Sequence, residues 1–196
     1  MSREVVPRNA YLVLGVLPTV SAEDLKSAYR ELARQHHPDR NPDDAEAAAA
    51  RLREVSAAHD AVTDATRRKA HDAPWMRLRV PKGLVMGEAS KPPGLLGRLF
   101  GMRPKDGPGS LYFTHMESGL TCFQYAGFKL VSQAEVEFRR ALETQPTSLE
   151  ARFNLAVVCH WLGRYDEART LLDAVVSAVP EDRVAAHLAS TLRAAP

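Results

Sequence analysis

The sequence has few of the features that mark secreted, metal-bound or membrane-spanning proteins. Its 196 residues include only two cysteines, Cys122 and Cys159, which lie far apart and form no Cys-x-x-Cys pair. This spacing supports neither a zinc ribbon nor a disulfide framework, so we expect two buried, reduced thiols. No window approaches the roughly 18 uninterrupted apolar residues of a membrane-spanning helix. Residues 1–8 hold no apolar core of signal-peptide length, and we therefore expect a cytoplasmic protein.

An excess of charge of one sign is also missing. The 26 Lys and Arg residues and 24 Asp and Glu residues give a formal charge of +2, too small to favour nucleic acid by bulk attraction. There is no phosphate-cradling glycine motif, no Ser or Cys nucleophile in a recognisable setting, and no carboxylate pair in an apparent cleft. The sequence thus predicts a protein that is not an enzyme and needs no cofactor.

The first feature that is present is an amphipathic helix. Ser21 is a good N-cap, and Asp24 three residues later completes an approximate capping box. One apolar face follows at i, i+4 and i+7, formed by Leu25, Tyr29 and Leu32. Because Pro38 has no amide hydrogen and disfavours helical geometry at the residue before it, the helix is predicted to end near His36.

Two polar features accompany the end of this helix. His37, Pro38 and Asp39 form a His-Pro-Asp turn outside regular structure, where a partner could reach them. A basic stripe at i, i+4 and i+8 precedes the turn and consists of Lys26, Arg30 and Arg34. A metal site at His36, His37 and Asp39 is disfavoured, because adjacent side chains diverge around a helix end and no further ligands follow at workable spacing.

A second helix is predicted after Asn41-Pro42-Asp43. Its apolar residues recur at helical spacing as far as Val62, so the two helices are expected to form an antiparallel hairpin. The stretch from Asp64 to Asp72 is rich in cations and predicts a small closing helix.

In order and spacing, residues 9–72 resemble the J-domain of the DnaJ family. The matching positions are Tyr11, Leu14-Gly15-Val16, Leu25, Tyr29-Arg30, Leu32, His37-Pro38-Asp39, Asp64, Arg68 and Asp72. J-domains are four-helix folds that bind a DnaK-type chaperone, the seventy-kilodalton heat-shock protein, and stimulate its ATP hydrolysis. The resemblance implies that His37, Pro38 and Asp39 engage that chaperone. It also implies that the basic stripe, with Arg40 beside it, steers the helix onto an acidic surface, an effect weakened by salt.

The sequence departs from the family pattern at four positions. Ala65 stands where proline is usual, His59 and His71 stand where the family generally has tyrosine, and Leu52 replaces an aromatic residue. These changes thin the aromatic packing, so we expect the closing helix to be held loosely. They also motivate an alternative in which the domain no longer signals and the chain is a scaffold.

Residues 73–110 are predicted to be a basic linker, because their prolines and glycines break both helix and strand periodicity. The linker contains one apolar patch, Leu95 to Met102. We expect the patch to lie against a flanking domain. The alternative is a peptide that docks on a partner or on an anionic membrane surface, which such a short segment would anchor only weakly.

An internal repeat follows between residues 111 and 196. Small and apolar residues recur at a constant offset of 34, pairing Ala134 with Ala168, Phe138 with Leu172, Ala141 with Val175, and Pro146 with Pro180. The period resembles the tetratricopeptide repeat. In the clearer second unit the characteristic residues are Asn154-Leu155-Ala156, Gly163 at the turn between helices, Tyr165 and Ala168. Residues 182–195 are expected to form a helix that caps the last repeat.

Tetratricopeptide repeats build concave surfaces that bind peptides or proteins, and the alternative is a helical core without a ligand. Some members grip a C-terminal carboxylate with several Asn, Lys and Arg residues. Only Asn154 falls on such a position here, with Arg152 a doubtful neighbour, so that mode is not supported. The sequence as a whole predicts an all-α co-chaperone with a J-domain at 1–72, a linker at 73–110 and repeats at 111–196 that bind a client or complex.

Overall fold

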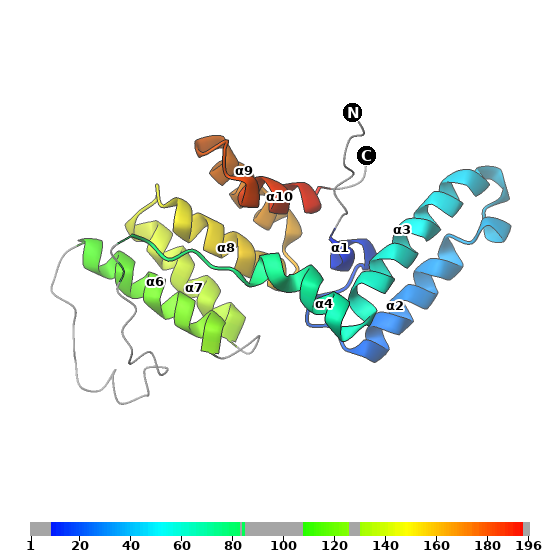
Figure 1. Ribbon diagram of the computed structural model, residues 1–196, viewed down its shortest axis with the longest axis horizontal. Helices are drawn as coiled ribbons and strands as arrows, with labels where there is room; N and C mark the ends of the chain where they lie inside the picture. The colour runs from blue at the N-terminus through cyan, green and yellow to red at the C-terminus, as the bar shows by residue number, and fades with distance from the viewer. Residues whose placement is uncertain (1–8, 83, 85–107, 126–129, 194–196) are drawn as a thin grey trace. The chain divides into compact units, whose positions relative to one another are not determined.

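The computed structural model describes residues 9–82, 84, 108–125 and 130–193, and within them it contains helices and turns but no strand (Figure 1). The predicted all-α class is confirmed. The described residues form two compact units. The first runs up to Arg77 and takes in the residues from Arg183 onward, and the second lies between Leu78 and Asp182. The apolar patch Leu95 to Met102 lies outside the described residues.

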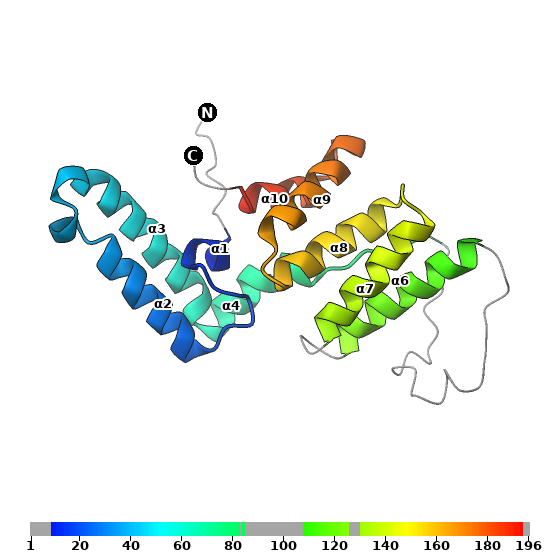
Figure 2. The same ribbon diagram turned by 180° about the vertical axis from the view of Figure 1, so that it is seen from behind.

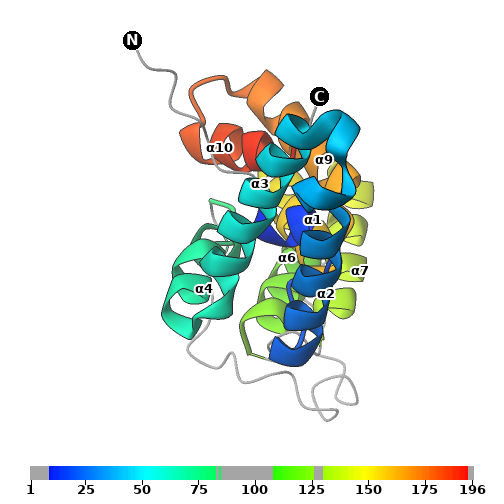
Figure 3. The ribbon, with the colours of Figure 1, turned by 90° about the vertical axis from the view of Figure 1, so that its right-hand side faces the viewer.

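Four helices and two single 3-10 turns make up the N-terminal part of the first unit. They are α1 (Ala10–Leu14), α2 (Ala22–Gln35), η1 (Pro38–Arg40), η2 (Pro42–Asp44), α3 (Ala45–Thr63) and α4 (Ala65–Asp72). Figure 3 shows α2 and α3 side by side, as the predicted hairpin requires. Helix α1 packs against α3, and the buried side chains between the helices include Tyr11, Leu14, Leu25, Val55 and Val62.

The hydrogen bonds of Ser21 confirm the predicted start of α2. The Ser21 Oγ accepts a hydrogen bond from the Asp24 backbone N–H at 3.1 Å and donates one to the Asp24 carboxylate at 2.7 Å. This satisfies one of the amides that a helix leaves unpaired in its first turn. At the other end His36 is the C-cap, in agreement with the predicted end of the helix.

The closing helix α4 is tied to α1 by several polar contacts, so the expectation of loose docking is wrong. The Tyr11 hydroxyl donates to the Asp72 carboxylate at 2.9 Å and accepts from Arg68 Nε at 3.0 Å. Arg68 Nη2 also donates to the carbonyls of Pro18 and Val20, at 2.8 and 3.1 Å. These hydrogen bonds hold α4 against α1 and the segment that follows it.

Helix α10 (Arg183–Thr191) completes the first unit. The Thr191 carbonyl accepts a hydrogen bond from the Asn9 backbone N–H at 2.8 Å, next to the start of α1. The α10 side chains Leu188 and Thr191 help to line a pocket of about 560 Å³ that α3, α4 and Trp75 also line. The sequence predicts α10 as a cap on the repeats, and the structure gives it these contacts with the J-like helices.

The second unit contains two helical hairpins (Figure 2). They are formed by α6 (Pro108–Tyr125) with α7 (Val131–Thr144), and by α8 (Leu149–Trp161) with α9 (Tyr165–Ala178). Both ends of α7 and α9 differ by the predicted offset of 34, and the residues that follow them, Gln145 and Val179, share the same backbone angles, φ −136° and ψ 83°. The two hairpins of the second unit are therefore structural repeats of each other. The start of α10 continues the same period from the start of α8.

The predicted repeat residues take the positions expected of them. The apolar members Ala134, Phe138, Ala141, Leu155, Ala156 and Ala168 are fully or almost fully buried. Gly163 turns the chain between α8 and α9 with φ 75°, a left-handed conformation that favours glycine. Tyr165 begins α9, and its ring lies 5.7 Å from that of His160. Pro146 and Pro180 are exposed just beyond the ends of α7 and α9.

An ion-pair network joins the two hairpins through α7 and α9. Arg139 pairs with Glu135 on its own helix at 2.9 Å and with Glu167 on α9 at 2.6 Å. The hydrogen bond from Arg139 to Glu167, followed by the one to Glu135, raises the pKa of the Arg139 guanidinium. Arg164 also binds Glu135. The nearly buried Glu135 carboxylate thus receives two guanidinium groups, which compensates for its loss of solvation.

Both ends of the predicted linker contain described structure. The short helix η3 (Ala73–Met76) buries Trp75, and an extended stretch follows it as far as Pro81. Helix α6 begins at Pro108, before the predicted end of the linker.

Candidate functional site

The His-Pro-Asp turn forms an exposed polar corner at the end of α2. His37 caps η1 by accepting the Asp39 backbone N–H on its Nδ1 at 3.3 Å, and this acceptor role leaves the proton of the neutral ring on Nε2. The His37 side chain is half exposed and the Asp39 side chain is 87% exposed. The turn therefore offers a ring donor and a carboxylate acceptor to solvent.

Asn41 holds this corner in place, and sequence reasoning missed its role. The Asn41 Nδ2 donates to the carbonyls of Gln35 at 2.8 Å and His37 at 2.9 Å, which ties the last turn of α2 to the turn that follows it. The backbone N–H of Asn41 also donates to the Pro38 carbonyl at 3.0 Å. The available signal was an Asn before Pro42, because Asn side chains frequently bond to the backbone of nearby turns.

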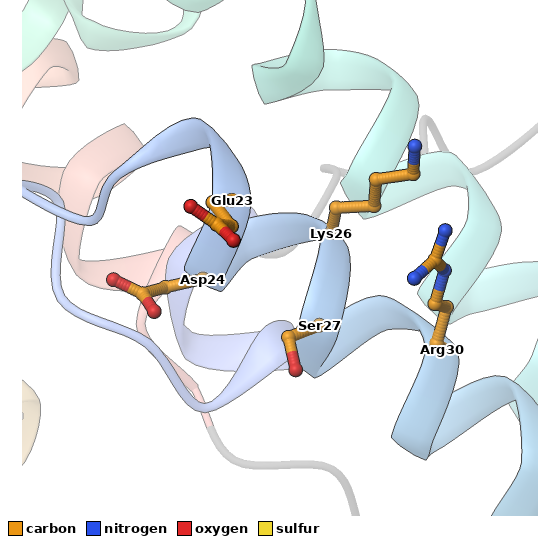
Figure 4. A pocket seen from close by; sticks show the side chains of 5 residues that line it. All are labelled: Glu23, Asp24, Lys26, Ser27 and Arg30. Carbon is orange, nitrogen blue, oxygen red and sulfur yellow. The ribbon is translucent and has the colours of Figure 1, made fainter.

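Two members of the basic stripe lie on one face of α2. Figure 4 shows Lys26 and Arg30 extending from the same side of the helix, one turn apart. Both are exposed, and within the described residues neither has an ion-pair partner. Glu23 and Asp24 lie in the first turn, where their negative charge is favourable to the helix dipole.

Arg34, the third member, differs from the other two because its charge is partly satisfied. It forms an ion pair with Glu31, and Gln35 donates a second hydrogen bond to the same carboxylate at 3.0 Å. The hydrogen bond from Gln35, followed by the nearby charge of Arg34, lowers the pKa of Glu31. Arg34 still lines a surface depression with Ala33, His37, Asp39 and Arg40, so the structure brings the end of the stripe and the turn together.

The two histidines that replace the family's usual tyrosines both have ring contacts. The His59 ring stacks on Tyr29 of α2 at 4.2 Å between centroids. His71 meets the edge of Tyr11 at 5.2 Å, and its Nε2 accepts the Ala10 backbone N–H at 3.2 Å. The two imidazole rings thus keep ring contacts with α2 and α1. The His71 ring also accepts a backbone hydrogen bond through its Nε2.

The second unit contains a site that the sequence did not predict as a whole. Asn154 on α8 is fully buried, and its amide pairs with both backbone groups of Arg79. The Arg79 N–H donates to Asn154 Oδ1 at 2.7 Å, while Asn154 Nδ2 donates to the Arg79 carbonyl at 2.8 Å. Asn154 was predicted as a repeat-packing residue, whereas Arg79 was assigned to the linker.

Among the described residues, no three His, Cys, Asp or Glu side chains come together in a way that could hold a metal ion. None of the helices within the described ranges has the length and apolar character needed to cross a membrane.

The geometry defines two classes of domain, a J-like four-helix domain with a polar turn and a pair of helical repeats. Family comparisons agree with both. Residues 9–72 match the family model described as the DnaJ domain, and residues 130–192 match the tetratricopeptide repeat model. The chain thus carries a DnaJ domain followed by tetratricopeptide repeats, as the sequence predicts. Both classes of domain are non-enzymatic co-chaperone or adaptor types.

Curated relatives match the DnaJ domain. A chaperone protein DnaJ from Chlamydia felis is 52% identical over 62 residues, which cover 32% of this chain and 16% of the relative. DnaJ homolog subfamily B member 8 of Mus musculus is 45% identical over 64 residues, covering 33% of this chain and 28% of that protein. DnaJ homolog subfamily C member 5 of Tetronarce californica is 47% identical over 62 residues, covering 32% and 31%.

The chain therefore spans less than a third of the length of these relatives. No solved structure matches the chain.

Proposed function

We propose that this protein is a co-chaperone that docks on a DnaK-type chaperone through the His-Pro-Asp turn and the basic stripe, and stimulates its ATP hydrolysis. The observation that carries the proposal is the exposed pair His37 and Asp39, fixed by Asn41 at the end of a cationic helix. A donor and an acceptor held in a rigid corner cost less entropy to bind than the same groups on a flexible loop.

The stripe supplies the second part of the proposal. Lys26 and Arg30 are exposed cations on one helix face, so they would accelerate encounter with an acidic surface and orient α2 upon it. The turn would then reach the partner at the end of the same helix. In this scheme the ATP chemistry belongs to the chaperone, and the chain itself is neither an enzyme nor a binder of nucleic acid or cofactor.

The repeats provide the protein-binding part. Two helical hairpins with a shared period make up this part, and on α8 the Asn154 amide already pairs with the backbone of an extended segment of the chain. We infer that this part selects or tethers a client or a complex, and that the protein acts in the cytoplasm. The alternative is a scaffold whose DnaJ domain no longer stimulates a chaperone, and it was based on Ala65, His59 and His71. The ring contacts of the two histidines and the polar contacts of α4 argue against it, because they support the packing of the domain.

The test is the rate of ATP turnover by a DnaK-type chaperone of the same host with and without the full chain. Wild type is expected to raise the rate, and His37→Gln is expected to abolish the increase. His36→Gln is the matched control, because it changes the neighbouring histidine outside the turn and should keep the stimulation. Equal turnover with wild type and His37→Gln would refute the proposal and favour the scaffold.

A further inference from the structure

The segment after η3 lies on the repeats as a short extended peptide. Residues 77–81 have no helical structure, and the green trace of this segment crosses α8 in Figure 1. Arg79 is the residue held at both backbone groups by Asn154, at a sequence separation of 75. Pairing one amide side chain with the N–H and the carbonyl of a single residue is recognition of an extended main chain.

The side chain of Arg79 is recognised as well as its backbone. The guanidinium carbon lies 3.7 Å from the centroid of the Phe153 ring, within the range of a cation–π contact. Its Nη2 forms an ion pair with the Asp182 carboxylate at 2.5 Å, and the Asp182 side chain is only 13% exposed. Lysine would lose the planar stacking on Phe153, so the combination is specific for arginine.

The residues beside Arg79 differ in exposure: Pro81 is buried, Leu78 is partly buried and Val80 is 48% exposed. The contacts that hold the segment on the repeats are those of Arg79, so the site reads an arginine in an extended conformation.

The segment matches the polar groups of the site. With Arg79 in place Asn154 is fully buried, and its amide is paired with both backbone groups of Arg79. The Arg79 guanidinium also compensates the charge of the largely shielded Asp182 carboxylate. A segment tethered next to its own site has an effective concentration in the millimolar range, so the chain's own arginine fills the site until a competitor displaces it.

We propose that Phe153, Asn154 and Asp182 form an arginine-peptide recognition site. The segment around Arg79 is its internal ligand, and an external extended peptide that carries an arginine must displace it. This names the chemistry of the partner for the repeats and rests on the proposed function only in that the repeats bind protein. It needs neither a chaperone nor ATP.

The first test is the binding of a fluorescent peptide with the sequence of residues 77–82 to the full chain, followed by anisotropy. Arg79→Ala in the chain weakens the internal ligand and is expected to tighten peptide binding by at least about tenfold relative to wild type. The control peptide has alanine in place of its Arg79 equivalent and should not bind either chain measurably. Asp182→Asn in the Arg79→Ala chain should weaken binding of the arginine peptide by roughly tenfold.

The second test uses the unaltered chain and is independent of how the variants fold. Excess arginine peptide is expected to speed hydrogen exchange at the Arg79 backbone N–H, which Asn154 protects, while the alanine peptide leaves that rate unchanged. The proposal is overturned if Arg79→Ala binds the peptide no more tightly than wild type, if both peptides bind equally, or if the Arg79 amide does not respond to excess arginine peptide. A chain that passes these tests but fails to stimulate ATP turnover would contradict the proposed function alone.

Discussion

The hydroxyl of Tyr11 donates to both carboxylate oxygens of Asp72, at 2.9 and 3.1 Å, across 61 positions of sequence. The same oxygen accepts from Arg68 Nε, and the Arg68 guanidinium lies 5.6 Å from the centre of the Tyr11 ring. One side chain on α1 thus holds the closing helix α4 through these hydrogen bonds and through its ring contact with His71. Removing that hydroxyl should loosen α4.

Tyr11→Phe is expected to lower the free energy of unfolding of the first unit by about 1–3 kcal/mol, because partly buried partners lose their hydrogen bonds. Urea unfolding can be followed by the fluorescence of Trp75, which is buried in this unit, in a Trp161→Phe background. Tyr29→Phe is the matched control, since it keeps the ring that stacks on His59, and should cost less than half as much. A loss at Tyr11 no larger than that at Tyr29 would show that α4 is held by other contacts.

Gly119 on α6 is predicted to resist substitution. A Cβ at this position would lie 2.6 Å from Cε1 of Phe138 on α7, and Phe138 is fully buried. Alanine gains about 1 kcal/mol in helix propensity, but overpacking costs about 1–3 kcal/mol. Gly119→Ala should therefore destabilise the second unit, measured by Trp161 fluorescence in a Trp75→Phe background.

The cause of that destabilisation can be isolated with a double-mutant cycle. Phe138→Leu shortens the side chain that the new methyl group meets, so Gly119→Ala should cost clearly less in that background than in wild type. Ser118→Ala, one position earlier on α6, is the control for a change in helix propensity alone. If Gly119→Ala stabilises the unit, the close approach of α6 to α7 is not as the structure describes it.

How much of this could be predicted depends on sequence separation. The 34-residue offset between α7 and α9, the Ser21 cap and the His-Pro-Asp turn follow from periodicity and local chemistry, and they were predicted. The anchoring of α4 was not, because the Tyr11–Asp72 and Arg68–Val20 contacts join residues 61 and 48 positions apart. The pairing of Arg79 with Asn154 was missed for the same reason: a stretch next to many prolines and glycines has the composition of a linker whether or not it is bound.

Stability at alkaline pH should depend on Cys159. Burial raises the pKa of the Cys159 thiol from an ordinary value of 9.0 to about 12, and the negative charge of Glu167 adds to the effect. Between these values the unfolded chain releases a proton that the folded chain retains, so stability falls as pH rises. The loss is at most about 1.4 kcal/mol for each pH unit in that window.

Cys159→Ala is expected to flatten this dependence between pH 9 and 12, whatever its effect on stability at neutral pH. Urea midpoints of the second unit at several pH values, read from Trp161, measure the slope. Cys122→Ala is the control, because Cys122 is less buried. Equal slopes for wild type and Cys159→Ala would mean that other groups carry the alkaline sensitivity.

The members of the basic stripe should contribute unequally to chaperone binding. Lys26→Ala and Arg30→Ala are each expected to weaken affinity by about two- to fivefold at low salt, and both changes should reduce the salt dependence. Arg34→Ala should have a smaller effect, because its charge is already paired with Glu31. Arg53→Ala, an exposed cation on α3, controls for net charge, and a loss as large as that of Arg30→Ala would argue against a defined stripe.

Single-turnover hydrolysis of ATP by the DnaK-type chaperone, measured while the full chain is titrated, tests the central claim most directly. Asp39 lies in the His-Pro-Asp turn and Asp43 lies four residues further, in η2, so Asp39→Asn and Asp43→Asn remove the same charge at neighbouring exposed positions. Wild type and Asp43→Asn should accelerate hydrolysis to the same plateau, and Asp39→Asn should leave it at the basal rate. Equal acceleration by both variants, or none by wild type, would contradict the role assigned to the turn.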